Sequence, residues 1–183
     1  MTSAVTVFDA VSRLPTKIPV VYASSAAVYG DATTIPIIEA TERRPLSAYG
    51  ADKYGCELHA LVASHVHGIP TVGLRFFNVY GPRQDPSSPY SGVISIFCEQ
   101  LRRGAPIDIF GDGEQTRDFV FVSDVVTALL AAMRLRPAGA SVFNVCTGTP
   151  TSVLKLAETI AQLAGAHVSA RHKPPRACDL AVI

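Results

Sequence analysis

Short apolar runs rich in valine alternate with longer stretches of helical periodicity along this chain. Residues 18–23 and 71–77 are two such runs; each lies close to proline and has the length of a buried strand. Between them, residues 47–66 carry leucine and valine at helical spacing, and Gly68 and Pro70 follow. Strands that alternate with helices of this length indicate a parallel sheet with crossover helices. The sequence therefore predicts an α/β fold.

The same periodicities give the remaining elements. Helices are expected at residues 2–14, about 91–103, 123–136 and 151–164, and strands at 107–110, 118–122 and 142–146. A hydroxyl at the start of a helix can accept from free backbone amides of the first turn. Ser123 is therefore expected to cap one helix, and Thr151 or Ser152 to begin another.

Composition excludes several classes of protein. Of the 183 residues, 48% are hydrophobic and 17% charged, which excludes a disordered chain. The net charge of +1 offers no field that would hold the chain on nucleic acid or on an anionic membrane. No apolar run is long enough to span a membrane, and residues 1–15 lack the pattern of a secretory signal, so a cytoplasmic location is expected. The four cysteines form no Cys-x-x-Cys pair, and no metal site is expected.

Two short segments carry side chains suited to proton transfer. Ser24 and Ser25 follow a buried strand, where open parallel sheets bind their ligands. Tyr49 and Lys53 are four residues apart, so they lie on one face of the expected helix. A phenol with a pKa of about 10 is a poor base at neutral pH, and a neighbouring ammonium or serine hydroxyl stabilises its anion. The spacing of tyrosine and lysine also arises by chance in helices, but the upstream serines favour a catalytic set with Tyr49 as proton shuttle.

Further motifs follow in a fixed order. They are Ser-Ser-x-x-Val-Tyr-Gly at 24–30, Tyr-x-x-x-Lys at 49–53, Arg-x-x-Asn-x-Tyr-Gly-Pro at 75–82, Gly-Asp-Gly-x-x-x-Arg-Asp-Phe at 111–119, Val-x-Asp at 122–124, and Pro-Pro-Arg at 174–176 with Asp179 after it. Over nearly the whole chain this order resembles the extended short-chain dehydrogenases/reductases. The likeness is greatest to their NAD-dependent nucleotide-sugar epimerases, typified by UDP-glucose 4-epimerase.

The resemblance implies a fold, a cofactor and a partner. Residues 1–82 would form part of a Rossmann-like dinucleotide-binding domain, the C-terminal half of its parallel sheet. Residues 83–183 would form mainly a small α/β substrate-binding lobe, with returns to the Rossmann sheet near 118–146. NAD would be the cofactor and a nucleotide-diphosphate sugar the substrate. A homodimer would form through the helix that carries Tyr49.

The resemblance also implies roles for individual residues. Ser25 and Tyr49 would contact the sugar hydroxyl that is oxidised, and Lys53 would hold the nicotinamide ribose. The expected cofactor-binding residues are Ser24, Tyr49, Lys53 and Phe76, and the expected substrate-binding residues are Ser25, Asn78, Arg117, Arg176 and Asp179.

The assignment of the diphosphate site has an independent basis in charge. Guanidinium groups meet phosphate oxygens with paired, charge-assisted hydrogen bonds, which suits Arg117 and Arg176. Arg117 could instead form a local surface ion pair with Asp118, and Asn78 could bond its own backbone as a loop residue.

One pair of residues separates branches of the family. Relatives that eliminate water carry an Asp-Glu pair directly after the catalytic serine or threonine, whereas this chain has Ala26 and Ala27, which cannot move a proton. The favoured function is therefore a 4-epimerase acting on UDP-glucose and UDP-galactose, or on an N-acetyl analogue, by transient oxidation at C4 and return of the hydride. The alternatives are a reductase or dehydrogenase of the same family, or a non-catalytic remnant or binding module.

The glycine-rich turn that anchors the NAD pyrophosphate in the family does not occur in these residues. We therefore expect a truncated form of the enzyme that binds NAD weakly, or not at all, without that turn.

Overall fold

The computed structural model describes residues 2–88, 91–135, 137–167 and 169–175. The chain divides into two compact units. Unit 1 comprises Met1–Phe77 and Ser123–Val145, and unit 2 comprises Asn78–Val122 and Cys146–Ile183. Each unit is built from its own sheet and helices.

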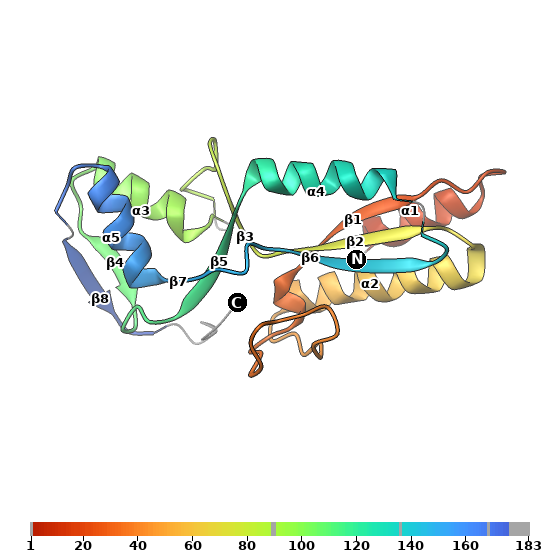
Figure 1. Cartoon of the computed structure of the whole chain (residues 1–183), viewed down its shortest axis with the longest axis horizontal. Coiled ribbons are helices and arrows are strands. Elements are labelled where there is room, and N and C mark those ends of the chain that lie inside the picture. The colour runs from red at the N-terminus through yellow and green to blue at the C-terminus, as the bar shows by residue number, and fades with distance from the viewer. Residues whose placement is uncertain (1, 89–90, 136, 168, 176–183) are drawn as a thin grey trace. The chain divides into compact units, whose positions relative to one another are not determined.

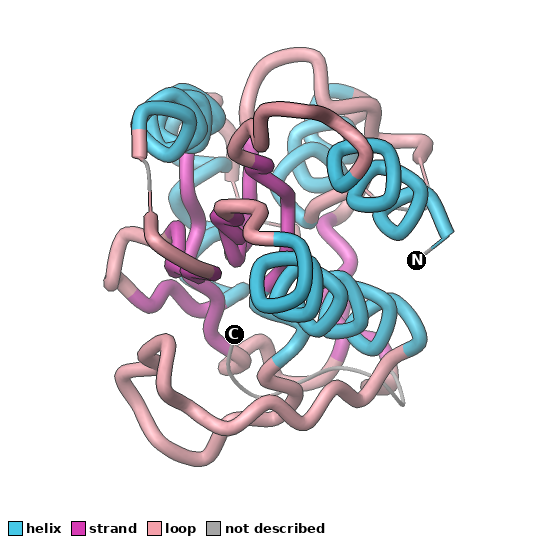
Figure 2. Tube along the Cα trace, turned by 90° about the vertical axis from the view of Figure 1, so that its right-hand side faces the viewer, coloured by secondary structure: helices cyan, strands magenta, loops and turns pink. Residues whose placement is uncertain are grey.

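Unit 1 contains a parallel sheet of strands β1 (Val20–Ser25), β2 (Thr71–Phe76) and β6 (Ala140–Val145), in the order β1-β2-β6. Helices α1 (Thr2–Ser12) and α2 (Ala48–His67) pack against each other on one face, and α4 (Val122–Arg134) lies on the opposite face (Figures 1 and 2). Parallel strands joined by crossover helices confirm the predicted α/β class.

Helix α2 begins and ends where its sequence signals predict. The Ser47 hydroxyl accepts from the Gly50 amide at 3.0 Å, and Gly68 closes the helix in the left-handed conformation. A core of Phe8, Val11, Ala60, Ala63 and Ile69 joins α1 and α2 below the sheet. The predicted helix at residues 47–66 is thus confirmed.

Unit 2 contains two small sheets. Strands β3 (Asn78–Tyr80), β5 (Thr116–Phe121) and β7 (Pro150–Ser152) form one sheet, in which β3 is parallel and β7 antiparallel to β5. Strands β4 (Ile107–Phe110) and β8 (Ala170–Lys173) form the other. Helices α3 (Val93–Arg102) and α5 (Val153–Leu163) cover a core that contains Phe97, Ile107 and Ile109.

The structure corrects one predicted cap and adjusts one strand. Ser123 is not a cap, because β5 runs directly into α4, which begins at Val122; its hydroxyl lies 3.4 Å from Asp124 Oδ1. The strand expected at 118–122 is observed at Thr116–Phe121 and pairs within unit 2, so the chain returns to unit 1 at Ser123. Ser152 does cap α5, accepting from the Lys155 amide at 3.1 Å. Within the described residues, no helix has the length and hydropathy needed to cross a bilayer.

A matched pair of glycine substitutions tests the close packing after β1. Gly30 and Gly68 have nearly equal positive φ angles, of 63° and 65°, but a Cβ on Gly30 would lie 2.0 Å from the Arg44 carbonyl oxygen, whereas one on Gly68 meets nothing within 4 Å. Gly68→Ala should lower the free energy of unfolding by about 1 kcal/mol, the cost of the left-handed conformation. Gly30→Ala should lose ~2 kcal/mol more through overpacking. Urea denaturation followed by circular dichroism measures both, and equal losses would contradict the clash.

Candidate functional site

Strand β1 ends at Ser25, and the chain turns there into a short 3-10 helix, η1 (Ala26–Val28). The Ser25 hydroxyl accepts from the Ala27 amide at 3.2 Å and so caps this helix. Ser25 lies beside Phe76, the last residue of β2, in the parallel register. Both side chains are therefore at the carboxyl ends of neighbouring strands, the edge at which parallel sheets bind ligands.

The first two turns of α2 carry Tyr49 and Lys53. Lys53 Nζ lies 5.6 Å from the centroid of the Tyr49 ring and donates to the Ala23 carbonyl oxygen at 3.1 Å. That carbonyl belongs to β1, two residues before Ser25. The lysine thus ties the tyrosine's helix to the strand that ends in the serine, and half of the Tyr49 surface remains exposed.

Gly50 explains how the helix can approach the strand end so closely. A Cβ at this position would lie 2.6 Å from the Ala27 carbonyl oxygen and 3.2 Å from the Pro45 side chain. The glycine directly after Tyr49 therefore allows the first turn of α2 to lie against η1.

Ser24 has a different environment from Ser25. It is 2% exposed, and its hydroxyl donates to Glu57 Oε1 at 2.5 Å. Its side chain therefore points into unit 1 and is already used by the protein, although we expected it to bind the cofactor.

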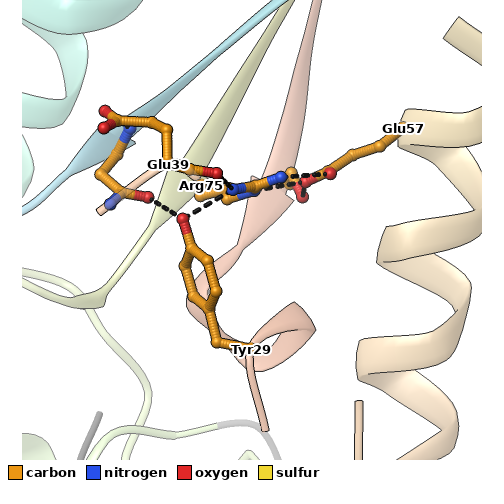
Figure 3. A network of polar contacts seen from close by, with 6 residues as sticks. Tyr29, Glu39, Glu57 and Arg75 are labelled. Atoms are coloured by element: carbon orange, nitrogen blue, oxygen red, sulfur yellow. Dashed lines mark hydrogen bonds and ion pairs between the residues drawn. The ribbon is translucent and has the colours of Figure 1, made fainter. Parts of the chain in front are cut away.

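Glu57 and Arg75 form a buried ion pair (Figure 3). Arg75 donates from Nε and Nη2 to the two carboxylate oxygens, at 2.8 and 2.7 Å. Burial by itself would lower the pKa of Arg75, but its hydrogen bonds to Glu57 and Tyr29 outweigh this and raise it. The guanidinium therefore stays charged at neutral pH. Removing one partner of such a pair costs about 3–5 kcal/mol.

The network continues from Arg75 to the residue after η1. Arg75 Nη1 donates to the Tyr29 hydroxyl oxygen at 2.6 Å and to the Glu39 carbonyl oxygen at 3.0 Å (Figure 3). The Tyr29 hydroxyl in turn donates to Asn144 Oδ1 on β6 at 2.6 Å. Burial is the main cause that raises the pKa of Tyr29, so its phenol stays protonated.

The residues predicted from the sequence to form the site do not include Glu57, Arg75, Glu39 or Asn144. Two features of the sequence nevertheless indicate the Glu57–Arg75 ion pair. An arginine within an otherwise apolar buried strand requires a counter-charge, and Glu57 stands four residues after Lys53, on the same helical face.

Unit 2 contains a cavity of about 390 Å³ that brings together Asn78 and Arg117, two of the predicted substrate-binding residues. Gln115, Phe110 and Asp108 also line it. Arg117 Nη1 donates to the Thr116 carbonyl oxygen at 2.8 Å.

The carboxylate in this cavity is neutralised by neighbouring cations. Asp108 accepts from Arg171 at 2.7 Å and forms an ion pair with Lys173 at 2.6 Å. The side-chain hydrogen bonds from Arg171 and Lys173 hold the pKa of Asp108 at about 2. The cavity therefore combines guanidinium, amide and aromatic groups, which suit a phosphorylated ligand.

Asp118 does not use its carboxylate on Arg117. Its oxygens accept from the Thr147 amide at 2.8 Å, the Thr147 hydroxyl at 3.0 Å and the Gly148 amide at 2.6 Å. Asn78 Nδ2 donates to the Asp118 carbonyl oxygen at 3.1 Å, so Asn78 contacts β5.

Arg176 and Asp179, the other predicted substrate-binding residues, lie outside the described residues. Within the part of the chain that the structure describes, no cluster of three or more His, Cys, Asp or Glu residues could hold a metal ion.

Comparison with known proteins places this geometry in a family. The family described as NAD dependent epimerase/dehydratase matches residues 1–146. A putative UDP-glucose 4-epimerase of Methanocaldococcus jannaschii is 41% identical over 158 residues, which cover 86% of this chain and 50% of that protein. The chain thus spans about half the length of the curated relative that it matches.

Solved structures agree over the whole chain. UDP-N-acetylglucosamine 4-epimerase from Methanobrevibacter ruminantium, in complex with UDP-N-acetylmuramic acid, superposes with a TM-score of 0.94 at 32% identity, covering 100% of this chain and 58% of that one. UDP-glucose 4-epimerase from Thermotoga maritima, with UDP-glucose, gives 0.93 at 34% identity, with the same coverage. The family match covers most of this chain, and the structural match covers all of it. The chain therefore belongs to the NAD dependent epimerase/dehydratase family.

Proposed function

We propose that this chain supplies the catalytic set and the substrate lobe of an NAD-dependent nucleotide-sugar 4-epimerase. The substrate pair would be UDP-glucose and UDP-galactose or an N-acetyl analogue. The observation that carries the proposal is the Tyr49–Lys53 pair on α2, tied through the Ala23 carbonyl to the strand that ends in Ser25.

The donor set fits the ribose and nicotinamide end of NAD. Lys53 offers an ammonium and Tyr49 a hydroxyl at the carboxyl edge of the sheet, and Phe76, which pairs with Ser25 in the register, offers an apolar ring at the end of β2. Lys53 and Tyr49 would hold the ribose hydroxyls, with Phe76 against the nicotinamide. When bound, NAD supplies a hydride acceptor that can return the hydride to the sugar.

The protein's own part is proton transfer and orientation. Ser25 would hold the C4 hydroxyl by a hydrogen bond while the Tyr49 phenolate takes its proton, as the C4 hydride leaves and a ketone forms. The Lys53 ammonium, which lies 5.6 Å from the centroid of the Tyr49 ring, would stabilise the negative charge of the phenolate in this step. Return of the hydride to the opposite face of the ketone, with the proton returned from Tyr49, gives the epimer.

Two alanines support epimerisation over elimination of water. Ala26 and Ala27 form the start of η1 directly after Ser25. Neither side chain can protonate a leaving hydroxyl or take a C5 proton. In the proposed cycle the hydride returns to C4 and no net NADH is formed.

The cavity of unit 2 would bind the substrate's diphosphate. Arg117 would meet the phosphate oxygens and Asn78 would add an amide donor. In this proposal unit 1 is the partial Rossmann-like domain and unit 2 the substrate lobe.

A homodimer is part of the same proposal. Four apolar side chains of α2 are exposed: Leu58, Leu61, Val62 and Val66. Exposed apolar faces of this kind mark association surfaces. A second copy of α2 would cover them.

The proton-shuttle role is tested by a pair of tyrosines on α2. Turnover is measured in a polypeptide that joins a glycine-rich NAD-binding segment of the family to this chain. Tyr49→Phe should reduce conversion of UDP-glucose to UDP-galactose by at least about a thousandfold, because it removes the hydroxyl that takes the C4 proton in the proposed cycle. Tyr54→Phe is the matched control and should retain activity. Tyr54 lies on the same helix as Tyr49, and its half-buried ring is covered by the Arg43 guanidinium. Undiminished turnover in Tyr49→Phe, or net NADH without epimer, would refute the proposal.

The diphosphate role is tested by calorimetric titration of this chain with UDP. Arg117→Met should weaken binding by about 10- to 100-fold, the equivalent of a lost charge-assisted hydrogen bond. Arg103→Met removes an exposed cation that pairs with Glu99 and does not line the cavity. It should leave the affinity unchanged. Equal losses in the two variants would mean that charge alone, and not the cavity, binds UDP.

A further inference from the structure

The buried Glu57–Arg75 pair holds both ends of the segment that carries Ser25 (Figure 3). Ser24, one residue before Ser25, donates its hydroxyl to Glu57 at 2.5 Å. Tyr29, four residues after it, accepts from Arg75 at 2.6 Å. Only Ser25 and helix η1 lie between these two links. One ion pair therefore fixes this short segment at both ends.

Glu57 also belongs to the other half of the site. It stands on α2 four residues after Lys53 and eight after Tyr49, so the three side chains share one helical face. Both side chains of the ion pair are almost fully buried, at 6% exposure for Glu57 and 3% for Arg75. The ion pair thus connects the Ser25 segment, through buried contacts, to the face of α2 that carries Tyr49 and Lys53.

We propose that Glu57 and Arg75 are positioning residues for Ser25. They act through the hydroxyls of Ser24 and Tyr29 and touch neither substrate nor cofactor. Ser24 is accordingly an internal link and not an NAD ligand. The inference rests on the function proposed above, because it takes the serine, tyrosine and lysine set as the reacting groups.

Two variants each cut one link to the ion pair without leaving a buried charge unpaired, and Tyr29→Phe also removes the hydrogen bond to Asn144. Ser24→Ala and Tyr29→Phe remove a hydroxyl but retain both Glu57–Arg75 hydrogen bonds, at 2.8 and 2.7 Å. The matched control is Val72→Ala. Val72 is fully buried in β2, so its truncation destabilises unit 1 by a cavity and leaves both links intact.

The first measurement is turnover in the NAD-competent polypeptide described above. Ser24→Ala and Tyr29→Phe should lower kcat by about 10- to 100-fold, because a misplaced reacting group loses rate more than binding. KM for UDP-glucose should stay within about threefold. Val72→Ala should lower the melting temperature at least as much as the two link variants do, and its kcat should stay within about twofold of the wild-type value. A kcat within twofold of the wild type in both link variants, where Tyr49→Phe is inactive, would overturn the proposal.

The second measurement needs no activity and uses this chain by itself. The Ala27 amide donates to the Ser25 hydroxyl, and the Ala51 amide donates to the Ser47 carbonyl at the start of α2. NMR measures the hydrogen-exchange rate of each amide. The rate of the Ala27 amide divided by that of the Ala51 amide should rise by about tenfold in the link variants and stay constant in Val72→Ala.

The two measurements separate this inference from the proposed function. A raised exchange ratio in a wild type without epimerase turnover would refute the function and leave the link between Ser24, Tyr29 and the ion pair intact. An unchanged ratio in both link variants would refute the positioning role, whatever the turnover.

Discussion

A guanidinium inside a parallel sheet must be neutralised where it lies, and unit 1 is organised around that requirement. Arg75 is the fifth residue of β2, buried between β1 and β6, and its only carboxylate partner among the described residues is Glu57. The pair requires α2 to turn the face of Glu57 toward the sheet. Since Tyr49 and Lys53 lie on that same face, the counter-ion of a buried arginine also decides where the candidate proton shuttle points.

The two units hold different parts of the expected chemistry. Unit 1 carries the serine, tyrosine and lysine at the edge where its parallel strands end, and unit 2 carries a cavity with an arginine, an amide and an aromatic ring. In the proposed function the first set would move protons and the second would bind the phosphates of the substrate. Neither set requires an unusual fold, because both use groups at strand ends or helix starts, where backbone geometry presents side chains outward.

Much of unit 1 could be predicted from local signals. Helix α2 was predicted from its periodicity and from Gly68, and the Tyr49–Lys53 pair from a spacing of four. Residue spacing does not reveal partners that are far apart in the sequence: Arg75 contacts Glu57 across 18 residues and Tyr29 across 46, and Asp118 contacts Thr147 across 29. Strands β3 and β7 were missed because three residues are too few to show a periodicity, and β8 because its sequence, Ala-Arg-His-Lys, has a single apolar residue. The Ser123 cap was wrong because a hydroxyl beside a predicted helix does not reveal that the preceding strand continues into it.

The chain passes between the units at 77/78, 122/123 and 145/146, so neither unit is synthesised as one continuous segment. Strand β6 completes the sheet of unit 1, but it is synthesised after most of unit 2. Tyr29 can therefore form its hydrogen bond to Asn144 only after residues 78–122, which belong to the other unit, have been synthesised. The three-stranded sheet of unit 1 can therefore form only after residues 78–122 of unit 2 have left the ribosome, so the folding of unit 1 cannot be completed before that part of unit 2 is present.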